Sequence, residues 1–267
     1  MARFLVRGAG DIGSAAALRL RSLGHAVVLH DVPRPSHSRR GMAFADAFFE
    51  DTCTLSGAFA KRASSAESLP KMLACGKALP VSDSPFGEVL AAVAPDVLVD
   101  ARMHKHGTPE RLRGLAPLVI GLGPGFVAGD NADLVIETAW GEDLGRVIRK
   151  GGSRTYSGDP RPLGGHGRER YVYASVAGTF RTTLAIGDSV DKGDVVARID
   201  DAVILAPLSG VLRGLTHDGA GVANGTKVLE VDPRGDPAGA FGVGERPARI
   251  AGGIIEAIAS RPDPDKD

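Results

Sequence analysis

The sequence predicts an α/β chain in which a parallel sheet covered by helices comes first and a small β-rich domain follows. Three features lead to this prediction. A glycine-rich turn near residue 8 separates a short apolar run from a helix-forming stretch, short apolar runs alternate with helical stretches up to residue 138, and an internal repeat follows residue 170. Apolar strands that alternate with helices are typical of a parallel sheet buried on both faces.

The composition is that of a globular protein and argues against several classes of partner. The chain has 267 residues, of which 43% are hydrophobic and 24% charged, and 32 basic residues balance 32 acidic ones. Because no basic field is present, we expect no nucleic-acid partner. The apolar runs are shorter than the roughly 18 residues of a membrane span, and the first one is too short for a signal peptide. We therefore expect a cytoplasmic protein with no membrane contact.

The two cysteines, Cys53 and Cys75, lie far apart in the sequence. They lack the spacing of a disulfide framework or of a structural zinc site. We expect buried free thiols and no metal site.

The first glycine-rich turn follows the run RFLV and contains Gly8, Gly10 and Gly13. A helix-forming stretch comes next, and HAVVLHD then indicates a second strand that ends at Asp31. In a Rossmann-type dinucleotide site, these glycines make the turn, admit the pyrophosphate and let the helix pack closely, and an acidic residue about twenty positions on binds the ribose. The spacing predicts a Rossmann-like nucleotide-binding domain. Its expected cofactor site contains Gly8, Gly10, Gly13 and Asp31.

Two alternatives stay open at this turn. The glycines would also suit a tight turn that binds nothing. Arg34, Arg39 or Arg40, which follow Asp31, would suit a phosphate group, so the choice between NAD and NADP stays open.

Four further apolar runs indicate strands, at residues 78–83, 96–101, 117–122 and 133–138. Ligands of open α/β sheets lie beyond the carboxyl ends of the strands. That rule selects Asp100, Arg102 and Glu137 as candidates for binding a substrate or an anion.

A second glycine-rich turn, GLGPGFVAG, contains Gly121, Gly123 and Gly125. Its backbone N–H groups would cradle a phosphate or a carboxylate, so these glycines join the candidate cofactor site. His104 and His106 precede this turn in RMHKH, and we expect them to be solvated loop residues rather than metal ligands.

The second half of the chain contains an internal repeat. Residues 174–200 align without a gap on residues 206–232, at a constant offset of 32 residues. Alternating apolar positions and recurrent glycines within each copy suit short strands and tight turns. The pattern resembles the barrel-sandwich hybrid of biotinyl and lipoyl carrier domains. The junction RIDDAVILAP lacks the lysine of such carriers, so we expect no covalent biotin or lipoate.

These features predict four consecutive segments along the chain. They are a Rossmann-like nucleotide-binding domain over 1–150, a Gly-, Pro- and Arg-rich linker or lid over 151–170, a barrel-sandwich-hybrid-like β domain over 171–235, and a C-terminal helix with a disordered tail over 236–267.

Segments spread over nearly the whole chain resemble the YqeB family of selenium-dependent molybdenum hydroxylase system proteins. The most specific are LVIGLGPGFVAG and the run from GVLRGL to EVDPRG, and VRGAGDIG, RRGMAFADAFF and PDVLVDARM also match. The resemblance implies an accessory role in maturing or supporting a molybdenum hydroxylase of the xanthine dehydrogenase type. The candidate site positions that the resemblance implies are Gly8, Gly10, Asp11, Arg39, Arg40, Asp100, Arg102, Gly121, Gly123, Gly125 and Glu137.

The expected function is therefore that of an accessory or maturation factor that binds a dinucleotide-type ligand in its Rossmann-like half. NAD(P) and a molybdopterin dinucleotide are the candidate cofactors, and a molybdenum hydroxylase or its maturation proteins are the candidate partners. Two alternatives stay open, an NAD(P)-dependent oxidoreductase acting on a small substrate and an adaptor with a vestigial site.

Overall fold

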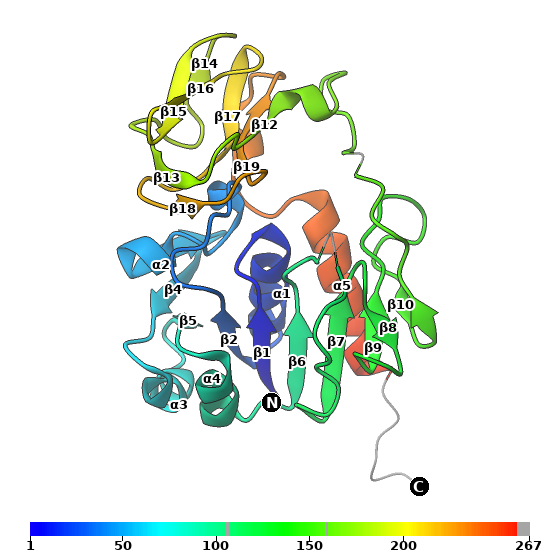
Figure 1. Cartoon of the computed structure of the whole chain (residues 1–267). Helices are drawn as coiled ribbons and strands as arrows, with labels where there is room; N and C mark the ends of the chain where they lie inside the picture. The colour runs from blue at the N-terminus through cyan, green and yellow to red at the C-terminus, as the bar shows by residue number, and fades with distance from the viewer. Residues whose placement is uncertain (105–106, 159, 261–267) are drawn as a thin grey trace, which may run out of the picture. The chain divides into compact units, whose positions relative to one another are not determined.

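The chain forms two compact units (Figure 1), and the computed structural model describes residues 1–104, 107–158 and 160–260. Unit 1 comprises Met1–Asp31, Ala63–Ser157 and Gly244–Asp267, and unit 2 comprises Val32–Arg62 and Gly158–Val243. The predicted disordered tail from residue 261 onward lies outside the described residues, as do His106 and residue 159 of the predicted linker.

Unit 1 is built on strands in the order β10-β9-β7-β6-β1-β2-β5. Neighbouring strands pair in parallel from β9 to β5, whereas β10 pairs antiparallel with β9. The strands are β1 (Arg3–Arg7), β2 (Ala26–His30), β5 (Leu79–Ser82), β6 (Val97–Asp100), β7 (Leu118–Leu122), β9 (Leu134–Ile136) and β10 (Val147–Ile148). A separate antiparallel pair consists of β8 (Val127–Ala128) and β11 (Gly151–Gly152).

Helices cover the buried residues of this sheet. They are α1 (Asp11–Ser22), η2 (Ala66–Ser68), α3 (Leu69–Cys75), α4 (Phe86–Val93) and α5 (Glu245–Ala259). Leu5, Val28 and Leu98 lie in one core cluster with Leu69 of α3 and Val89 of α4. Helix α5 packs against α1, so the last helix of the unit lies beside its first.

Unit 2 contains two four-stranded sheets, in the orders β12-β19-β17-β14 and β16-β15-β13-β18. Their strands are β12 (Tyr171–Tyr173), β13 (Gly178–Arg181), β14 (Ser189–Val190), β15 (Val195–Ile199), β16 (Ala202–Leu205), β17 (Gly210–Leu215), β18 (Gly221–Val222) and β19 (Lys227–Asp232). Phe180, Ile199, Leu212 and Leu229 belong to the shared core of these strands. The unit also holds η1 (Arg40–Met42), α2 (Ala47–Glu50), η3 (Arg168–Arg170), η4 (Pro237–Ala240) and the hairpin of β3 (Thr52–Leu55) and β4 (Ala58–Arg62).

The predicted fold class is wrong. Counted with the β3–β4 hairpin, the large sheet has nine strands and is mixed, not the parallel sheet of a Rossmann-like domain. The hairpin forms because Ser56 and Gly57 both adopt positive φ, 47° and 80°, as a tight two-residue antiparallel turn requires. Unit 2 also includes residues 32–62, so it is not a barrel-sandwich-hybrid-like domain built from two repeats alone.

Two smaller observations bear on the sequence-based expectations. Cys53 is half-buried but Cys75 is exposed, so the expectation of two buried thiols is wrong for Cys75. Among the described residues, no helix has the length and apolar character needed to cross a membrane.

Candidate functional site

The first glycine-rich turn packs against the protein's own backbone. Gly8 follows β1 with a φ of 103°, and a Cβ there would lie 2.8 Å from the carbonyl carbon of Ala101 and 2.9 Å from the amide nitrogen of Arg102. A Cβ on Gly13 would clash with the carbonyl of Gly8. Glycine is required at these positions because α1 and the chain that leaves β6 both approach the turn closely.

Asp31 holds this turn from the end of the neighbouring strand. Its Oδ2 accepts a hydrogen bond of 2.6 Å from the backbone N–H of Ala9, and the residue is 8% exposed. Gly10 is the N-cap of α1, and Asp11 is its first residue, whose Oδ1 accepts a hydrogen bond from the Ile12 N–H. The carboxylate expected to bind a ribose hydroxyl thus binds the backbone of the glycine turn.

The second glycine-rich turn is also filled by neighbouring side chains. A Cβ on Gly121 would clash with the ring of Phe126, and a Cβ on Gly125 would lie 2.5 Å from Cδ of Pro109. Gly123 and Gly125 have φ values of 81° and 84°, which favour glycine. Internal packing and backbone conformation therefore account for these three glycines.

Glu137 is a buried carboxylate whose oxygens accept backbone hydrogen bonds. Its Oε1 accepts from the N–H groups of Thr138 and Ala139, at 2.7 and 2.8 Å, and its Oε2 accepts from the Arg154 N–H at 2.8 Å. With 1% exposure, Glu137 fixes the chain after β9.

Charged side chains gather at the carboxyl ends of β1 and β6. Arg7 ends β1 and lies opposite Asp100 in the parallel β1–β6 register. Asp100 is fully buried and accepts hydrogen bonds from Arg102, 3.0 Å from Nε and 2.5 Å from Nη2 to Oδ2. Strands β2 and β5 lie to one side of β1, and β6 and β7 lie to the other. These side chains therefore flank the point where the strand order reverses, which is where open α/β sheets bind ligands.

Glu110 joins the two guanidinium groups through a single oxygen. Its Oε1 lies 2.5 Å from Nη1 of Arg7 and 2.6 Å from Nη2 of Arg102. The side chain of Arg7 is 7% exposed and that of Arg102 27%, whereas that of Glu110 is 51% exposed. Within the described part of the chain, Arg7 Nε is buried without a hydrogen-bond partner. We call Arg7, Asp100, Arg102 and Glu110 the Arg7 site.

Aromatic and imidazole rings surround the Arg7 site. The guanidinium of Arg7 lies 3.6 Å from the centre of the Phe86 ring, which fixes its orientation. His30 ends β2 and places Nε2 3.0 Å from the carbonyl oxygen of Ser84. His104 directs its buried Nε2 toward Asp100, 3.7 Å from Oδ2.

The carboxylates of the site are ionised at neutral pH. Burial would raise the pKa of Asp100, but its contacts with His104 and Arg102 and the charge of Arg102 lower it to about 2. Burial would also raise the pKa of Glu110, but hydrogen bonds and charges from Arg7 and Arg102 lower it. The pKa of Arg7 is lowered, mainly by burial.

The structure brings the predicted residues Asp100 and Arg102 together with two residues that the sequence analysis missed, Arg7 and Glu110. A signal for Arg7 exists in the sequence, since it is a charge that ends the otherwise apolar run of RFLVR. Glu110 has no comparable signal, because it lies on an irregular segment, 103 residues from Arg7 in the sequence.

The predicted residues Arg39 and Arg40 belong to unit 2. Arg40 donates to both oxygens of Asp46 at 2.9 Å, and Arg39 contacts Glu230. The described residues hold no group of three or more His, Cys, Asp or Glu side chains suited to a metal ion.

The chain is similar to a curated protein over most of its length. No family model matches the chain. The curated protein YqeB of Escherichia coli is 39% identical over 254 residues, which is 95% of this chain and 47% of that protein. The chain is therefore similar to that protein over nearly all of its own length. The chain spans about half the length of the curated relative, and the match carries no information on selenium or molybdenum hydroxylases.

Solved structures similar to the chain include proteins named as succinylglutamate desuccinylases or aspartoacylases. A succinylglutamate desuccinylase/aspartoacylase from Rhodobacter sphaeroides is 15% identical, with 86% of this chain and 84% of that chain covered and a TM-score of 0.27. An aspartoacylase family protein from Mesorhizobium loti is 9% identical, with the same coverages and a TM-score of 0.27. These TM-scores are too low for any activity to be transferred to this chain.

The function expected from the sequence is wrong. That expectation requires a dinucleotide site in a Rossmann-like half, whereas the large sheet is mixed and the Asp31 carboxylate, which was expected to bind a ribose, accepts a hydrogen bond from the Ala9 N–H. Two alternatives depend on the same predicted Rossmann-like half and are dropped with it. They are an NAD(P)-dependent oxidoreductase and an adaptor with a vestigial site.

Proposed function

We propose that unit 1 binds a small molecule by its carboxylate group, at Arg7 and Arg102. The observation that supports this proposal is the position of Glu110, whose Oε1 lies 2.5 and 2.6 Å from the two guanidinium groups. Guanidinium groups are suited to carboxylates because their donors form a planar fork that matches carboxylate geometry. Glu110 holds the place that a ligand carboxylate would take.

Exchange of Glu110 for a ligand is favoured by the difference in burial between the partners. Glu110 is half-exposed, and an ion pair with an exposed carboxylate contributes little net free energy. Arg7 is buried against Phe86, and Arg102 is bound to buried Asp100, so both guanidinium groups are oriented before a ligand arrives. A ligand carboxylate would replace Glu110 without moving either arginine.

The charges of the Arg7 site limit the ligand to one bound carboxylate. Asp100 and Arg102 form a close pair, and Glu110 balances Arg7. Loss of Glu110 from this site leaves one uncompensated positive charge, which a single carboxylate neutralises.

A Glu110→Gln variant tests the proposal, with acetate as the probe and uncharged acetamide as its counterpart. At constant ionic strength, acetate should raise the melting temperature of the variant more than that of the unchanged protein, because the competing carboxylate is gone. Acetamide should raise neither.

Asp143→Asn is the matched control. Asp143 also contacts two arginines, Arg146 and Arg154, but both are more than half-exposed, so its loss should create no acetate site. An equal response of Glu110→Gln to acetate and acetamide would refute the proposal, as would an equal acetate response of Asp143→Asn.

A further inference from the structure

A cleft lies within unit 1 between helix α5 and the segment that joins β9 to β10. Helix α5 packs against both strands (Figure 1). The volume of the cleft is about 420 Å³, which is within the range of small-molecule sites. Its lining consists of residues 142–146 of the joining segment and of Arg249, Gly252, Gly253 and Glu256 of α5. The Arg7 site contributes no residue to this lining.

Two glycines hold the joining segment against the helix. Gly145 has a φ of 89°, and a Cβ there would lie 2.5 Å from the carbonyl oxygen of Arg249. A Cβ on Gly253 would clash with the carbonyl oxygen of Gly145. The N–H of Gly145 also donates a hydrogen bond of 2.9 Å to the carbonyl oxygen of Glu137. These backbone contacts fix both walls of the cleft before a ligand arrives.

Gly252 has no comparable role in the packing of the protein. It lies near the middle of α5, and a Cβ there would meet no heavy atom within 4 Å. Glycine in the interior of a helix is less favourable than alanine. Close packing therefore requires glycine at Gly253 but not at Gly252. The missing side chain of Gly252 leaves open space in the lining of the cleft.

Charged side chains lie on both sides of Gly252. Arg249 is three residues before it and Glu256 four residues after it, so all three lie on the same face of α5. Nη2 of Arg249 lies 3.4 Å from the backbone carbonyl oxygen of Glu142, which places Glu142 beside this arginine. Among the described residues, the exposed carboxylates of Glu142 and Glu256 contact no cation, and Arg249 contacts no carboxylate.

The two remaining charges of the lining contact each other. Oδ1 of Asp143 lies 3.4 Å from Nε of Arg146, and its Oδ2 lies 2.5 Å from Nη2 of Arg154. The groups of the cleft that are open to a ligand are therefore one guanidinium, with a carboxylate beside it and a second carboxylate further along the helix. The helix rises by about 10 Å over the seven residues that separate Arg249 from Glu256.

We propose that this cleft binds a basic amino acid, a small molecule with one carboxylate and two ammonium groups. The guanidinium of Arg249 suits the ligand carboxylate because its planar fork of donors matches carboxylate geometry. Glu142, beside Arg249, would contact the α-ammonium group next to that carboxylate. The ligand side chain would cross the open space at Gly252 and place its terminal ammonium group at Glu256.

Calorimetric titration of the full chain with lysine tests the proposal, at constant ionic strength. Two analogues each lack one of the three charges, since 6-aminohexanoate has no α-ammonium group and 1,5-diaminopentane has no carboxylate. We expect lysine to bind saturably and each analogue to bind about threefold or more weakly, because a single exposed ion pair contributes little free energy. Glu256→Gln should weaken lysine binding by a similar factor of about three.

Gly252→Leu should weaken lysine binding by about tenfold or more, because the new side chain would occupy the cleft. Ala248→Leu is the matched control, since Ala248 is exposed on the same helix but does not line the cleft. Gly252→Ala checks that the helix accepts a side chain at this position. Without ligand, it should raise the melting temperature by about 2 to 4 °C, because alanine favours the helix.

Three results would each overturn the proposal. They are the absence of saturable lysine binding to the unchanged protein, equal binding of lysine and both analogues, and an equal loss of binding in Ala248→Leu and Gly252→Leu. Circular dichroism checks that both leucine variants fold. Glu110→Gln should leave lysine binding to the cleft unchanged, because Glu110 does not line it. A failure of this proposal is therefore distinguishable from a failure of the acetate test at the Arg7 site.

Discussion

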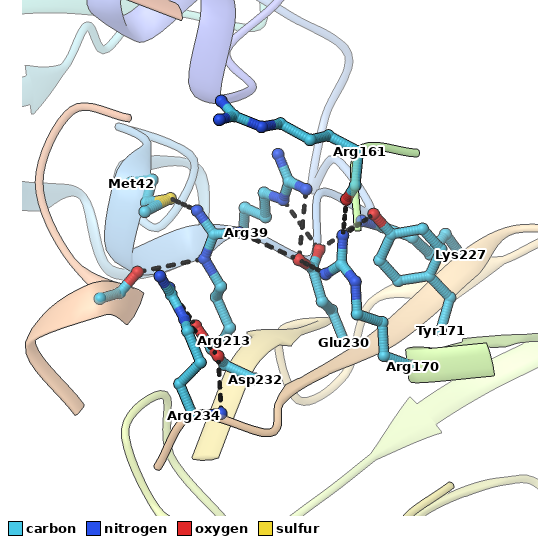
Figure 2. A network of polar contacts seen from close by, with 11 residues as sticks. Arg39, Met42, Arg161, Arg170, Tyr171, Arg213, Lys227, Glu230, Asp232 and Arg234 are labelled. Carbon is cyan, nitrogen blue, oxygen red and sulfur yellow. Dashed lines mark hydrogen bonds and ion pairs between the residues drawn. The ribbon is translucent and has the colours of Figure 1, made fainter. Parts of the chain in front are cut away.

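Replacing Glu230 with glutamine should destabilise the protein strongly, because it removes the charge shared by four cations and nearly preserves the shape of the side chain. The four cations are Arg39, Arg170, Arg213 and Lys227 (Figure 2). Removal of one partner from a buried ion pair typically costs about 3 to 5 kcal/mol. We take about 4 kcal/mol, since Glu230 is fully buried and both oxygens are occupied. At about 2 to 4 °C per kcal/mol for a chain of this size, the melting temperature should fall by roughly 10 °C.

The pH dependence of this difference follows from the pKa of Glu230. Burial would raise the pKa, but the charges of Lys227 and Arg39 and their hydrogen bonds hold it well below its ordinary value. Ionised Glu230 therefore stabilises the fold above the unfolded pKa of about 4.3, and this contribution is lost as the pH falls through the folded pKa. The difference in unfolding free energy between the two proteins should shrink below about pH 4.

Urea denaturation at pH 7 and at pH 3 measures both effects. Glu169→Gln serves as the control, because Glu169 is 53% exposed and contacts His166 at the surface of the same unit, so its loss should change stability by less than about 0.5 kcal/mol. A cost below about 1 kcal/mol for Glu230→Gln at pH 7, or the same cost at both pH values, would refute this account of Glu230.

Three further predictions concern other parts of the chain. Asp100→Asn should lower the free energy of unfolding by about 2.5 kcal/mol at pH 7, because the pKa of Asp100 is lowered to about 2 and each pKa unit corresponds to about 1.4 kcal/mol. Urea denaturation should show that this difference becomes smaller as the pH falls from about 4 to about 2. Gly8→Ala should lower the free energy of unfolding by more than about 3 kcal/mol, because its Cβ would overlap the backbone. Gly24 has a φ of 81° and no heavy atom within 4 Å of the position that a Cβ would take, so Gly24→Ala should cost only about 1 kcal/mol in the same assay. Iodoacetamide at neutral pH should modify exposed Cys75 but not Cys53, whose pKa is raised to about 12 by burial, and peptide mass spectrometry reads out both sites; modification of Cys53 in the folded protein would contradict this.

Much of the secondary structure could be predicted because its signals are local. The runs assigned to strands at 78–83, 96–101, 117–122 and 133–138 contain β5, β6, β7 and β9, and the stretch after the first glycine turn forms α1. The β3–β4 hairpin was missed although Ser56–Gly57 is a recognisable two-residue turn. The mixed sheet could not be predicted, because strand order and antiparallel partners depend on contacts between residues far apart in the sequence.

The candidate sites could be predicted only where strand ends mark them. Asp100 and Arg102 follow a strand, and the rule for parallel sheets selects them. Glu230 was missed because a charge within an alternating strand usually faces solvent, and its burial depends on arginines up to 191 residues away. The role of the glycines could not be decided from the sequence, because a glycine that admits a ligand has the same sequence signature as one that admits the protein's own backbone, as Gly8 does.

The path of the backbone determines the order in which the units can be completed during synthesis. Unit 1 begins with β1, but its last helix, α5, follows all the residues of unit 2. Helix α5 packs on α1 and β9, and Gly253 approaches the Gly145 carbonyl so closely that a Cβ would clash. On the ribosome, every residue of unit 2 is therefore available before α5 emerges. Unit 1 is therefore the first unit to begin synthesis and the last to be completed. Helix α1 lacks its partner helix α5 until about residue 259 has been synthesised.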